Sequence, residues 1–450
     1  MNRSGHFVAV IGGAVAGSEA VYNLTKRGIR CIVFDQNYLP YGKLESGLPK
    51  WHIKLRDKQE ALIDERLDNP LVEYVPLTRM GDRISFADLH EKWGFSAILL
   101  ATGAWRDRPL GINGIDSFIN NGLYYQNQFV DWFNKNHDPG FKDSAYHIVD
   151  NAIIIGGGLA SIDVAKIIMT ETVQQALHQR GIETNVLELE KKGIAAFLES
   201  QNLRYEDLNL SGCTLYYRRR AVDMPLSSLP ENPNDKDYEQ AFYVRKKILD
   251  NVQSKFLFKL EDCSQPLDAI IESNQLKGLV FQKTETKEGV SSVIDGSEYH
   301  VYTPMIISAI GSLPEEIPGL PYTGSTFDVS DEESGKIRGF HNVFALGNAV
   351  TGRGNIRESQ LHGRRVSERV MDEYLVWREE DYQEIFDRAA ANAEEKIKSI
   401  EGHLQNSPLL TSIQIDSIMK KVYEQQQIVH YDRDYKQWVK IHLPRRLEAE

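Results

Sequence analysis

Two glycine-rich turns carry the residues of this sequence whose types and spacing suit nucleotide chemistry. The first reads Gly12-Gly13-Ala14-Val15-Ala16-Gly17 and directly follows the apolar run Phe7 to Ile11. Glycines let the backbone approach a pyrophosphate, which is attracted by the unpaired N–H groups and the dipole of a following helix. Asp35 follows about 20 residues later, where an acid accepts a hydrogen bond from a ribose hydroxyl. Ala14 replaces the second glycine of the motif, and its methyl displaces a pyrophosphate slightly without excluding it.

The elements that must position this turn are those of a βαβ unit. Phe7 to Ile11 is typical of a parallel strand buried on both faces. The pattern then predicts a helix from about Ser18 to Arg27, which ends at Gly28, and a second strand over Cys31 to Phe34.

The second turn, Gly156 to Ser161, repeats the arrangement. It follows a predicted strand, Ala152 to Ile155, and precedes a predicted helix over Ile162 to Thr170. The next predicted strand, Thr214 to Tyr217, ends in Arg218-Arg219-Arg220 and not in an acid. Arginine pairs with a 2′-phosphate, whereas an acid accepts from a free 2′-hydroxyl, so this turn is predicted to prefer NADPH. The spacing does not decide which arginine contacts the phosphate.

Composition sets the outer bounds. A chain of 450 residues exceeds what one core usually organises, so at least two domains are expected. Its 52 basic and 64 acidic residues give a net charge of −12, which argues against nucleic-acid binding. No signal peptide and no run of about 18 apolar residues is visible, so neither export nor a membrane span is expected.

The three cysteines, Cys31, Cys213 and Cys263, are far apart and form no C-x-x-C pair. This spacing fits a cytoplasmic protein and speaks against a redox-active dithiol, a structural zinc or a protein-bound iron–sulfur cluster. We therefore expect no metal site.

Two dinucleotide turns in one chain indicate two nucleotide cofactors. The economical pairing is a flavin on the first and a nicotinamide on the second, with a hydride passing between the rings. Such a transfer needs stacked rings and exclusion of water, so no catalytic side chain is expected.

The order of these motifs, together with Pro40-Tyr41-Gly42 and Ala101-Thr102-Gly103, resembles adrenodoxin reductase and the related small subunit of glutamate synthase. These are two-domain flavoproteins that carry electrons from NADPH. The resemblance extends over roughly residues 5 to 370 and includes the segment Val343 to Ile356. Asn348 stands where related flavoproteins have an aspartate, which keeps the hydrogen-bonding ability and removes a charge. A helix that begins near Gly354-Asn355-Ile356 would direct its positive end at the flavin.

The resemblance implies the cofactor contacts of both sites. For FAD they are Gly12, Ala14, Ala16, Gly17, Asp35, Gln36, Tyr41, Gly42, Leu44, Ala101, Thr102, Gly103, Gly347, Asn348, Gly354, Asn355 and Ile356. For NADPH they are Gly156, Gly158, Leu159, Ala160, Ser161, Arg218, Arg219 and Arg220.

The expected fold is an α/β fold with two Rossmann-like dinucleotide-binding domains and a C-terminal helical extension. An NADPH domain (106–325) is inserted into a discontinuous FAD domain (1–105 and 326–370), and the extension covers 371–450. Within the extension, Trp377 to Gly402 and Leu410 to Gln426 are predicted helices. The tail, with Tyr431, Tyr435, Trp438 and His442, either covers the flavin, bridges to a second subunit or packs on its own domain.

The leading hypothesis is an NADPH:ferredoxin reductase, which passes a hydride from NADPH to FAD and then electrons to a ferredoxin-type iron–sulfur protein. The alternatives are reduction of a small organic acceptor, service as the NADPH-oxidising subunit of a larger complex, and a non-catalytic flavin redox sensor. Ferredoxins are usually acidic, so basic docking residues are expected. The candidates are Arg245-Lys246-Lys247 and the group Arg357, His362, Arg364 and Arg365. The acceptor, the direction of electron flow and a homodimer are left open.

Overall fold

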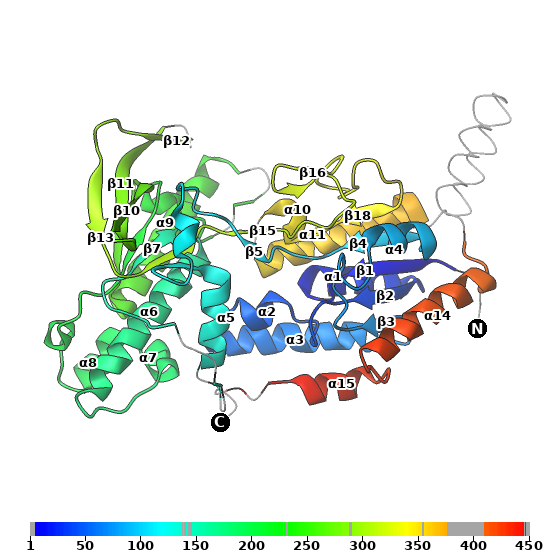
Figure 1. The fold of residues 1–450 in the computed structure, drawn as a ribbon, viewed down its shortest axis with the longest axis horizontal. Coiled ribbons are helices and arrows are strands. Elements are labelled where there is room, and N and C mark those ends of the chain that lie inside the picture. The colour runs from blue at the N-terminus through cyan, green and yellow to red at the C-terminus, as the bar shows by residue number, and fades with distance from the viewer. Residues whose placement is uncertain are drawn as a thin grey trace. The chain divides into compact units, whose positions relative to one another are not determined.

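The computed structural model describes residues 5–136, 138, 141–142, 146–227, 229–230, 233–287, 290–352, 355–375, 409–444 and 446. The chain forms two compact units. Unit 1 consists of Met1–Leu48, His52–Arg106 and Ser312–Arg445, and unit 2 consists of Pro49–Trp51, Asp107–Gly311 and Arg446–Glu450. Each unit contains its own parallel sheet, as Figure 1 shows. The α/β fold with two such sheets is the class that the sequence predicts.

The sheet of unit 1 has five parallel strands in the order β18-β4-β1-β2-β3. The strands are β1 (Phe7–Ile11), β2 (Arg30–Phe34), β3 (Val72–Val75), β4 (Ala97–Leu100) and β18 (Val343–Ala345). Side chains of β1 alternate between two cores: Val8 and Val10 contribute to one, and Phe7, Ala9 and Ile11 to the other.

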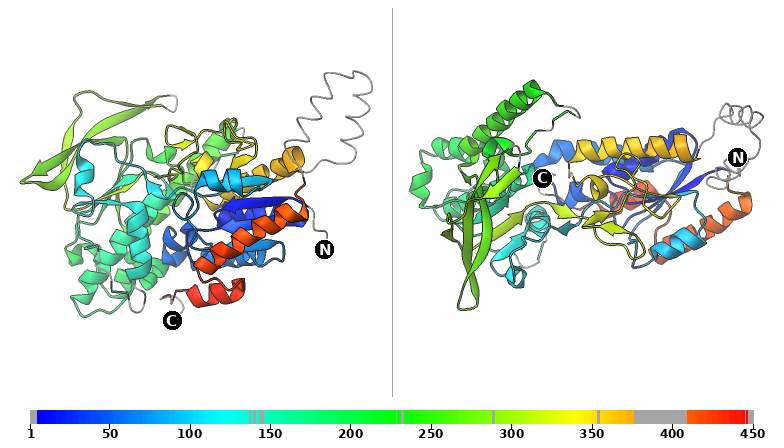
Figure 2. Two further views of the ribbon diagram at one scale, coloured as in Figure 1. Left: turned by 45° about the vertical axis from the view of Figure 1, so that its right-hand side comes forward. Right: turned by 90° about the horizontal axis from the view of Figure 1, so that it is seen from above.

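Helices cover both faces of this sheet. The first core includes residues of α1 (Val15–Lys26), α3 (Ile53–Leu67), α11 (Ile356–Arg369) and α15 (Tyr435–His442). The second includes residues of α4 (Phe86–Lys92) and α14 (Ser412–Ile428). Shorter elements of unit 1 are α2 (Lys43–Ser46), β16 (Tyr322–Thr323), β17 (Thr326–Phe327), α10 (Asn348–Thr351) and a π-helical turn, Val370–Leu375. In Figure 2, α14 lies beside the strands of unit 1 in both views.

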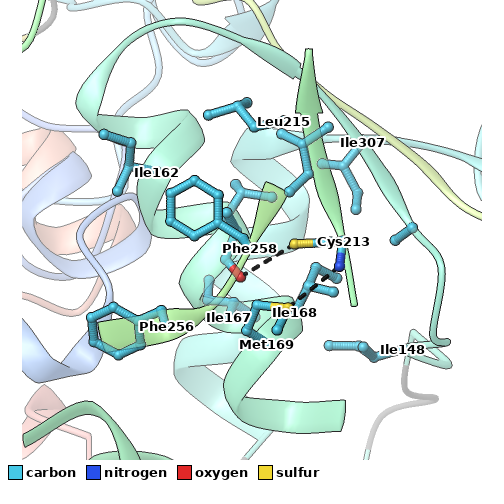
Figure 3. Packing of buried hydrophobic residues seen from close by; sticks show 14 of the residues in the cluster. Ile148, Ile162, Ile167, Ile168, Met169, Cys213, Leu215, Phe256, Phe258 and Ile307 are labelled. Carbon is cyan, nitrogen blue, oxygen red and sulfur yellow. Dashed lines mark hydrogen bonds between the residues drawn. The ribbon is translucent and has the colours of Figure 1, made fainter. Parts of the chain in front are cut away.

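Unit 2 repeats the plan with strand order β6-β14-β7-β8-β9, again all parallel. These strands are β6 (Leu123–Tyr125), β7 (Ile153–Gly156), β8 (Thr214–Tyr216), β9 (Lys259–Glu261) and β14 (Ile306–Ala309). The helices are α5 (Gln126–Asn136), α6 (Leu159–His178), α7 (Val186–Lys192), α8 (Ile194–Ser200) and α9 (Asp235–Phe256). Their apolar side chains form one core with Ile154, Leu215 and Ile307 of the sheet, part of which Figure 3 shows.

An antiparallel sheet covers the other face of the unit 2 sheet. It consists of β10 (Ser264–Glu272), β11 (Gln275–Lys287), β12 (Val290–Val293) and β13 (Tyr299–Tyr302). Leu279 and Phe281 of β11 pack with Ile153 and Ile155 of β7. The short strands β5 (Arg106–Asp107) and β15 (Ser312–Leu313) pair with each other.

Two boundaries differ from the sequence expectation. The chain rejoins unit 1 at Ser312, earlier than the expected 325, because Ile317 and Leu320 are buried in the second core of that unit. The extension is likewise part of unit 1, since α14 and α15 contribute to its two cores. The predicted helix Leu410 to Gln426 is found at Ser412–Ile428, and Trp377 to Gly402 lies outside the described residues.

Candidate dinucleotide sites

The first glycine turn follows β1 and is closed by contacts that exclude side chains. Gly12 has a φ of +101°, and its N–H donates to the carbonyl oxygen of Phe34 at 2.7 Å. A Cβ on Gly12 would lie 2.5 Å from the carbonyl oxygen of Ala101, and one on Gly17 would lie 1.9 Å from that of Gly12. Only glycine fits at either position, so the backbone forms a tight turn at the carboxyl edge of the sheet.

Helix α1 starts directly after this turn. Its N-cap residue is Ala14, and no side chain caps the helix. An uncapped helix start at the end of a parallel strand is a favourable place for an anionic group. The structure therefore brings the expected pyrophosphate contacts Ala14, Ala16 and Gly17 together at one helix N-terminus.

Asp35 lies beside the turn, at the end of β2. Its carboxylate accepts from the N–H groups of Gly13 (2.8 Å) and Asn37 (2.9 Å), and the residue is 4% exposed. Burial raises the pKa of Asp35 to about 6, against the opposing effect of these two donors. Additional hydrogen-bond donors, such as ribose hydroxyls, would stabilise the charged form of this buried carboxylate.

Residues from distant parts of the sequence surround the same turn. Gly42, at φ +57°, is so close that an added Cβ would lie 2.9 Å from the Cβ of Ala14. Gly347, at φ +75°, would place a Cβ 2.8 Å from that of Ala16. Ala101 contacts Gly12 and Gly17 in the same way. The structure thus assembles four of the expected FAD segments around one helix start.

Two polar side chains near this turn lack partners. Thr102 Oγ1 and Asn348 Oδ1 are buried, and neither makes a hydrogen bond within the part of the chain that the structure describes. Buried polar atoms are normally satisfied. Orphaned oxygens on the segments that follow β4 and β18, beside a turn that excludes side chains, fit a bound dinucleotide.

Other expected FAD residues are occupied differently. The side chains of Tyr41 and Leu44 are buried in the core of unit 1, so only their backbone is available to a ligand. Asn355 accepts from the N–H of Glu358 and caps α11, which starts at Ile356 as predicted. Gln36 and Gly103 follow β2 and β4, and Gly354 lies outside the described residues. Their contacts with FAD stay predictions.

A buried charge cluster behind the turn was missed in the sequence. Glu19 of α1 is 1% exposed and pairs with Arg66 of α3 and Arg364 of α11, the latter at 2.8 Å. The carboxylate therefore joins three helices that pack around the first turn. No local signal predicts this, since the two arginines are 47 and 345 residues away.

His362, which the sequence placed among the docking candidates, has a structural role instead. Its Nδ1 accepts from the N–H of Gly347 at 2.9 Å, and its Nε2 lies 2.9 Å from the carbonyl oxygen of Glu332. Because a carbonyl only accepts, the ring is a neutral donor at Nε2 and an acceptor at Nδ1. Burial lowers the pKa of His362, which favours this neutral form. The imidazole fixes the turn that carries Gly347 and Asn348.

The second glycine turn follows β7 in unit 2. A Cβ on Gly156 would lie 2.6 Å from the carbonyl oxygen of Ala309, and one on Gly157 would lie 2.1 Å from the ring of Tyr217. Gly158, the N-cap residue of α6, has nothing within 4 Å of its Cβ position, and no side chain caps the helix. Neighbouring atoms therefore block the Cβ positions of Gly156 and Gly157, whereas the backbone at Gly158 is open to a ligand. The next residues are Leu159, which is half exposed, and Ala160.

Ser161 has a structural partner. Its hydroxyl donates to the carbonyl oxygen of Gly158 at 2.7 Å, and the residue is fully buried. The serine thus tightens the turn, and its side chain is not directed to a ligand.

The three arginines after β8 have different environments. Arg220 is bidentate to Asp223, with both N···O distances 2.9 Å. Arg219 donates from Nε to the Tyr217 hydroxyl at 2.9 Å. Arg218 is exposed, and among the described residues none accepts from its guanidinium; its backbone oxygen accepts from Thr284 and Ser291. Arg218 is the arginine that is held in place and still available to a phosphate.

The basic residues expected to dock a ferredoxin are largely engaged in the protein itself. Arg245 is buried and donates to the carbonyl oxygens of Val222 and Ser227. Lys246 pairs with Asp250, Arg364 pairs with Glu19, and His362 is buried. Arg245 and His362 were therefore wrong choices for a docking surface, because they are buried, whereas Lys246 and Arg364 are exposed and already pair with a carboxylate.

Among the described residues, no group of three or more His, Cys, Asp or Glu side chains is placed to hold a metal ion. The three cysteines are free thiols, two of them buried. Within the same segments, none of the helices combines the length and the hydropathy that a membrane crossing needs.

The comparisons with known proteins agree with this geometry. Residues 6–199 match the family described as pyridine nucleotide-disulphide oxidoreductase. The mitochondrial NADPH:adrenodoxin oxidoreductase of Arabidopsis thaliana is 24% identical over 70% of this chain and 69% of its own length. The glutamate synthase [NADPH] small chain of Bacillus subtilis is 29% identical over 40% of this chain and 35% of its own length.

A solved structure shares the fold. FprA from Mycobacterium tuberculosis in complex with NADPH superimposes with a TM-score of 0.63 at 16% identity, over 93% of this chain and 100% of that chain.

The fold and the two turns define a class of two-site dinucleotide oxidoreductases. Residues 6–199 are similar to the pyridine nucleotide-disulphide oxidoreductase family, and the chain is an oxidoreductase that resembles adrenodoxin reductase, as the sequence indicates. The expected cofactors, FAD and NADPH, agree with these matches.

Proposed function

We propose that this chain oxidises NADPH with FAD as its flavin cofactor and delivers the electrons to a ferredoxin-type iron–sulfur protein. Unit 1 binds FAD and unit 2 binds NADPH. FAD, when bound, accepts a hydride and releases electrons one at a time, which suits a one-electron acceptor.

The observation that carries this proposal is the pair of glycine turns on two separate parallel sheets, each followed by an uncapped helix start, with residues of opposite charge after the next strand. The first turn is next to the acid Asp35, and the second is paired with Arg218. An acid suits a ribose hydroxyl and a free arginine suits a 2′-phosphate. The two sites therefore differ in the nucleotide that they favour.

On the FAD side, the residues of the chain bind and orient. The uncapped start of α1 receives the pyrophosphate, and Asp35 accepts from the ribose. Thr102 and Asn348, whose oxygens are buried and unpartnered, supply hydrogen bonds further along the cofactor. Helix α11 presents its N-terminus to the flavin and so favours negative charge on the reduced ring.

On the NADPH side, the open backbone at Gly158 and the start of α6 receive the pyrophosphate. Arg218 pairs with the 2′-phosphate. The Tyr217 ring lies against Gly157, and its hydroxyl holds Arg219. Hydride transfer requires only that the two rings are aligned, so no side chain needs to exchange a proton with the nicotinamide.

The names of the relatives support the proposed acceptor. The Arabidopsis protein is named for adrenodoxin, and that match covers about two thirds of both chains. A second candidate function is service as the NADPH-oxidising subunit of a larger enzyme, which the likeness to a glutamate synthase small chain favours. The three separate cysteines still predict a reducing compartment such as the cytoplasm.

Turnover with and without ferredoxin separates the two candidates. Purified protein with FAD and NADPH should reduce cytochrome c only slowly. Addition of a ferredoxin whose reduction potential matches that of the flavin should accelerate cytochrome c reduction at least tenfold. Equal rates with and without ferredoxin, combined with fast flavin reduction, would point to another acceptor or to a missing partner subunit.

A further inference from the structure

The aromatic tail at the C-terminus has no place in the chemistry above, yet it is tied closely to unit 1. Helix α14 buries Ile415, Ile418 and Val422 in the second core, and α15 buries Trp438 and Val439 in the first. Near the end of α14, the Gln426 amide donates to the carbonyl oxygen of Tyr74 on strand β3, at 2.9 Å. The extension therefore wraps the β3 edge of the sheet.

Helix α15 holds the loop that follows Asp35. The indole N–H of Trp438 donates to the carbonyl oxygen of Tyr38 at 2.7 Å. The Tyr38 ring stacks on Trp438 and on His442, with centroids 6.2 and 4.7 Å apart. The Tyr38 side chain is nevertheless half exposed, so its ring is held mainly by α15, while its carbonyl oxygen also accepts from the Tyr74 hydroxyl at 3.4 Å.

A second connection runs through Asp64 of α3. The hydroxyl of Tyr41 donates to this carboxylate at 3.0 Å, and the hydroxyl of Tyr435 donates to it at 2.8 Å. Tyr41 is 1% exposed, and burial raises the pKa of Asp64 while both tyrosines oppose the rise. Asp64 thus links the far end of the same loop to α15.

The loop 36–42 joins two parts of the first dinucleotide site. It begins after Asp35, and it ends at Gly42, which lies against Ala14 of the glycine turn. The loop contains no helix or strand, so its shape is not fixed by a ladder of backbone hydrogen bonds. Trp438 and Tyr435 contact it at Tyr38 and, through Asp64, at Tyr41.

We propose that α15 is the positioning element of the FAD loop, with Trp438 and Tyr435 as positioning residues that hold residues 36–42 in the shape that retains FAD. This inference rests on the proposed binding of FAD to unit 1. Neither side chain touches the expected cofactor contacts of the glycine turn; both act through the loop.

The test uses Tyr435→Phe and Trp438→Phe in the full chain. Tyr435→Phe removes one hydrogen bond and keeps the ring, whereas Trp438→Phe removes the indole N–H donor and replaces the indole by a smaller aromatic ring. The matched control is Tyr431→Phe. Tyr431 lies in the same cluster, edge-on to Trp438 at 5.2 Å, and among the described residues its hydroxyl makes no hydrogen bond. The measured quantities are the dissociation constant and the release rate of FAD, by flavin fluorescence, and the melting temperature of the FAD-free protein.

Each test variant should weaken FAD binding about five- to tenfold and accelerate its release, as for the loss of roughly one hydrogen bond. The control should stay within about twofold. FAD binding like that of the unmodified protein in both test variants, with a lower melting temperature, would show that α15 only stabilises the fold and would overturn the proposal. If Trp438→Phe fails to fold, Tyr435→Phe decides. Absence of FAD binding in the unmodified protein would instead contradict the proposed function.

Discussion

Arg218 differs from the two arginines that follow it because its guanidinium is not engaged within the described residues. Arg219 is held by Tyr217 and Arg220 by Asp223, which costs each of them freedom to pair with a ligand. The three arginines look equivalent in the sequence, but their side-chain environments show that Arg218 is the most available to a phosphate.

Replacing Arg218 by alanine should weaken NADPH binding at least tenfold and leave NADH binding unchanged. A charged hydrogen bond contributes roughly 1.5–3 kcal/mol, and only NADPH has the phosphate. The matched control is Arg220→Ala, which should change NADPH binding by less than threefold. The measurement is the apparent Kd of each nucleotide from flavin reduction; an equal loss for NADPH and NADH would contradict the assignment.

Asp35 should make the stability of the FAD-free protein depend on pH. Its folded pKa of about 6 lies above the usual 3.8, so folding favours the protonated form. That stabilisation is present below about pH 4 and is lost as the pH rises to about 6, with a total of about 3 kcal/mol. Urea unfolding of the unmodified chain and of Asp35→Asn, from pH 4.5 to 7.5, should show the unmodified chain losing stability relative to the variant. Parallel pH curves would contradict this.

At the scale of elements, the turn before α6 contains one glycine that has no room for a side chain, Gly157, and one that has room, Gly158. Gly157→Ala would place its Cβ 2.1 Å from the Tyr217 ring and should destabilise the protein by about 1–3 kcal/mol through overpacking. Gly158→Ala meets nothing within 4 Å and should leave the melting temperature within about 2 °C while weakening NADPH binding. Thermal melts and nucleotide titrations of both variants test this; a destabilised Gly158→Ala would show that the turn is not open there.

The elements that a local pattern encodes were predicted well. Phe7 to Ile11 is a strand with the predicted bounds, because its apolar run is short and is followed by turn residues. The first helix begins at Val15 and not at Ser18, since the glycine turn is shorter than the motif suggests. Helix ends are set by local capping, which the sequence records less clearly than periodicity.

At the scale of the whole molecule, contacts between distant segments were beyond prediction. Glu19 is an ordinary helix residue in the sequence, yet its buried partners come from α3 and α11. The placement of α15 against the loop after β2 joins residues about four hundred positions apart, Tyr38 and Trp438. A pattern with a period of two or 3.6 residues carries no information about such pairs.

The residues of the candidate site likewise divide into those whose role the sequence predicts and those whose role depends on distant contacts. The two glycine turns and Asp35 were visible because chemistry requires those residue types at that spacing. The roles of Tyr41, Ser161 and Asn355 were not, because each side chain meets a structural partner instead: Asp64, Gly158 and Glu358. His362 was expected on a docking surface and is instead the residue that fixes the Gly347 turn.

The most direct test of the central claim is an anaerobic titration of the purified FAD-reconstituted protein with NADPH, followed by its visible absorption. Two nucleotide sites that serve one hydride transfer predict a flavin spectrum that bleaches with one equivalent of NADPH and responds poorly to NADH. A protein that takes up no FAD, or a flavin that NADPH leaves oxidised, would contradict it.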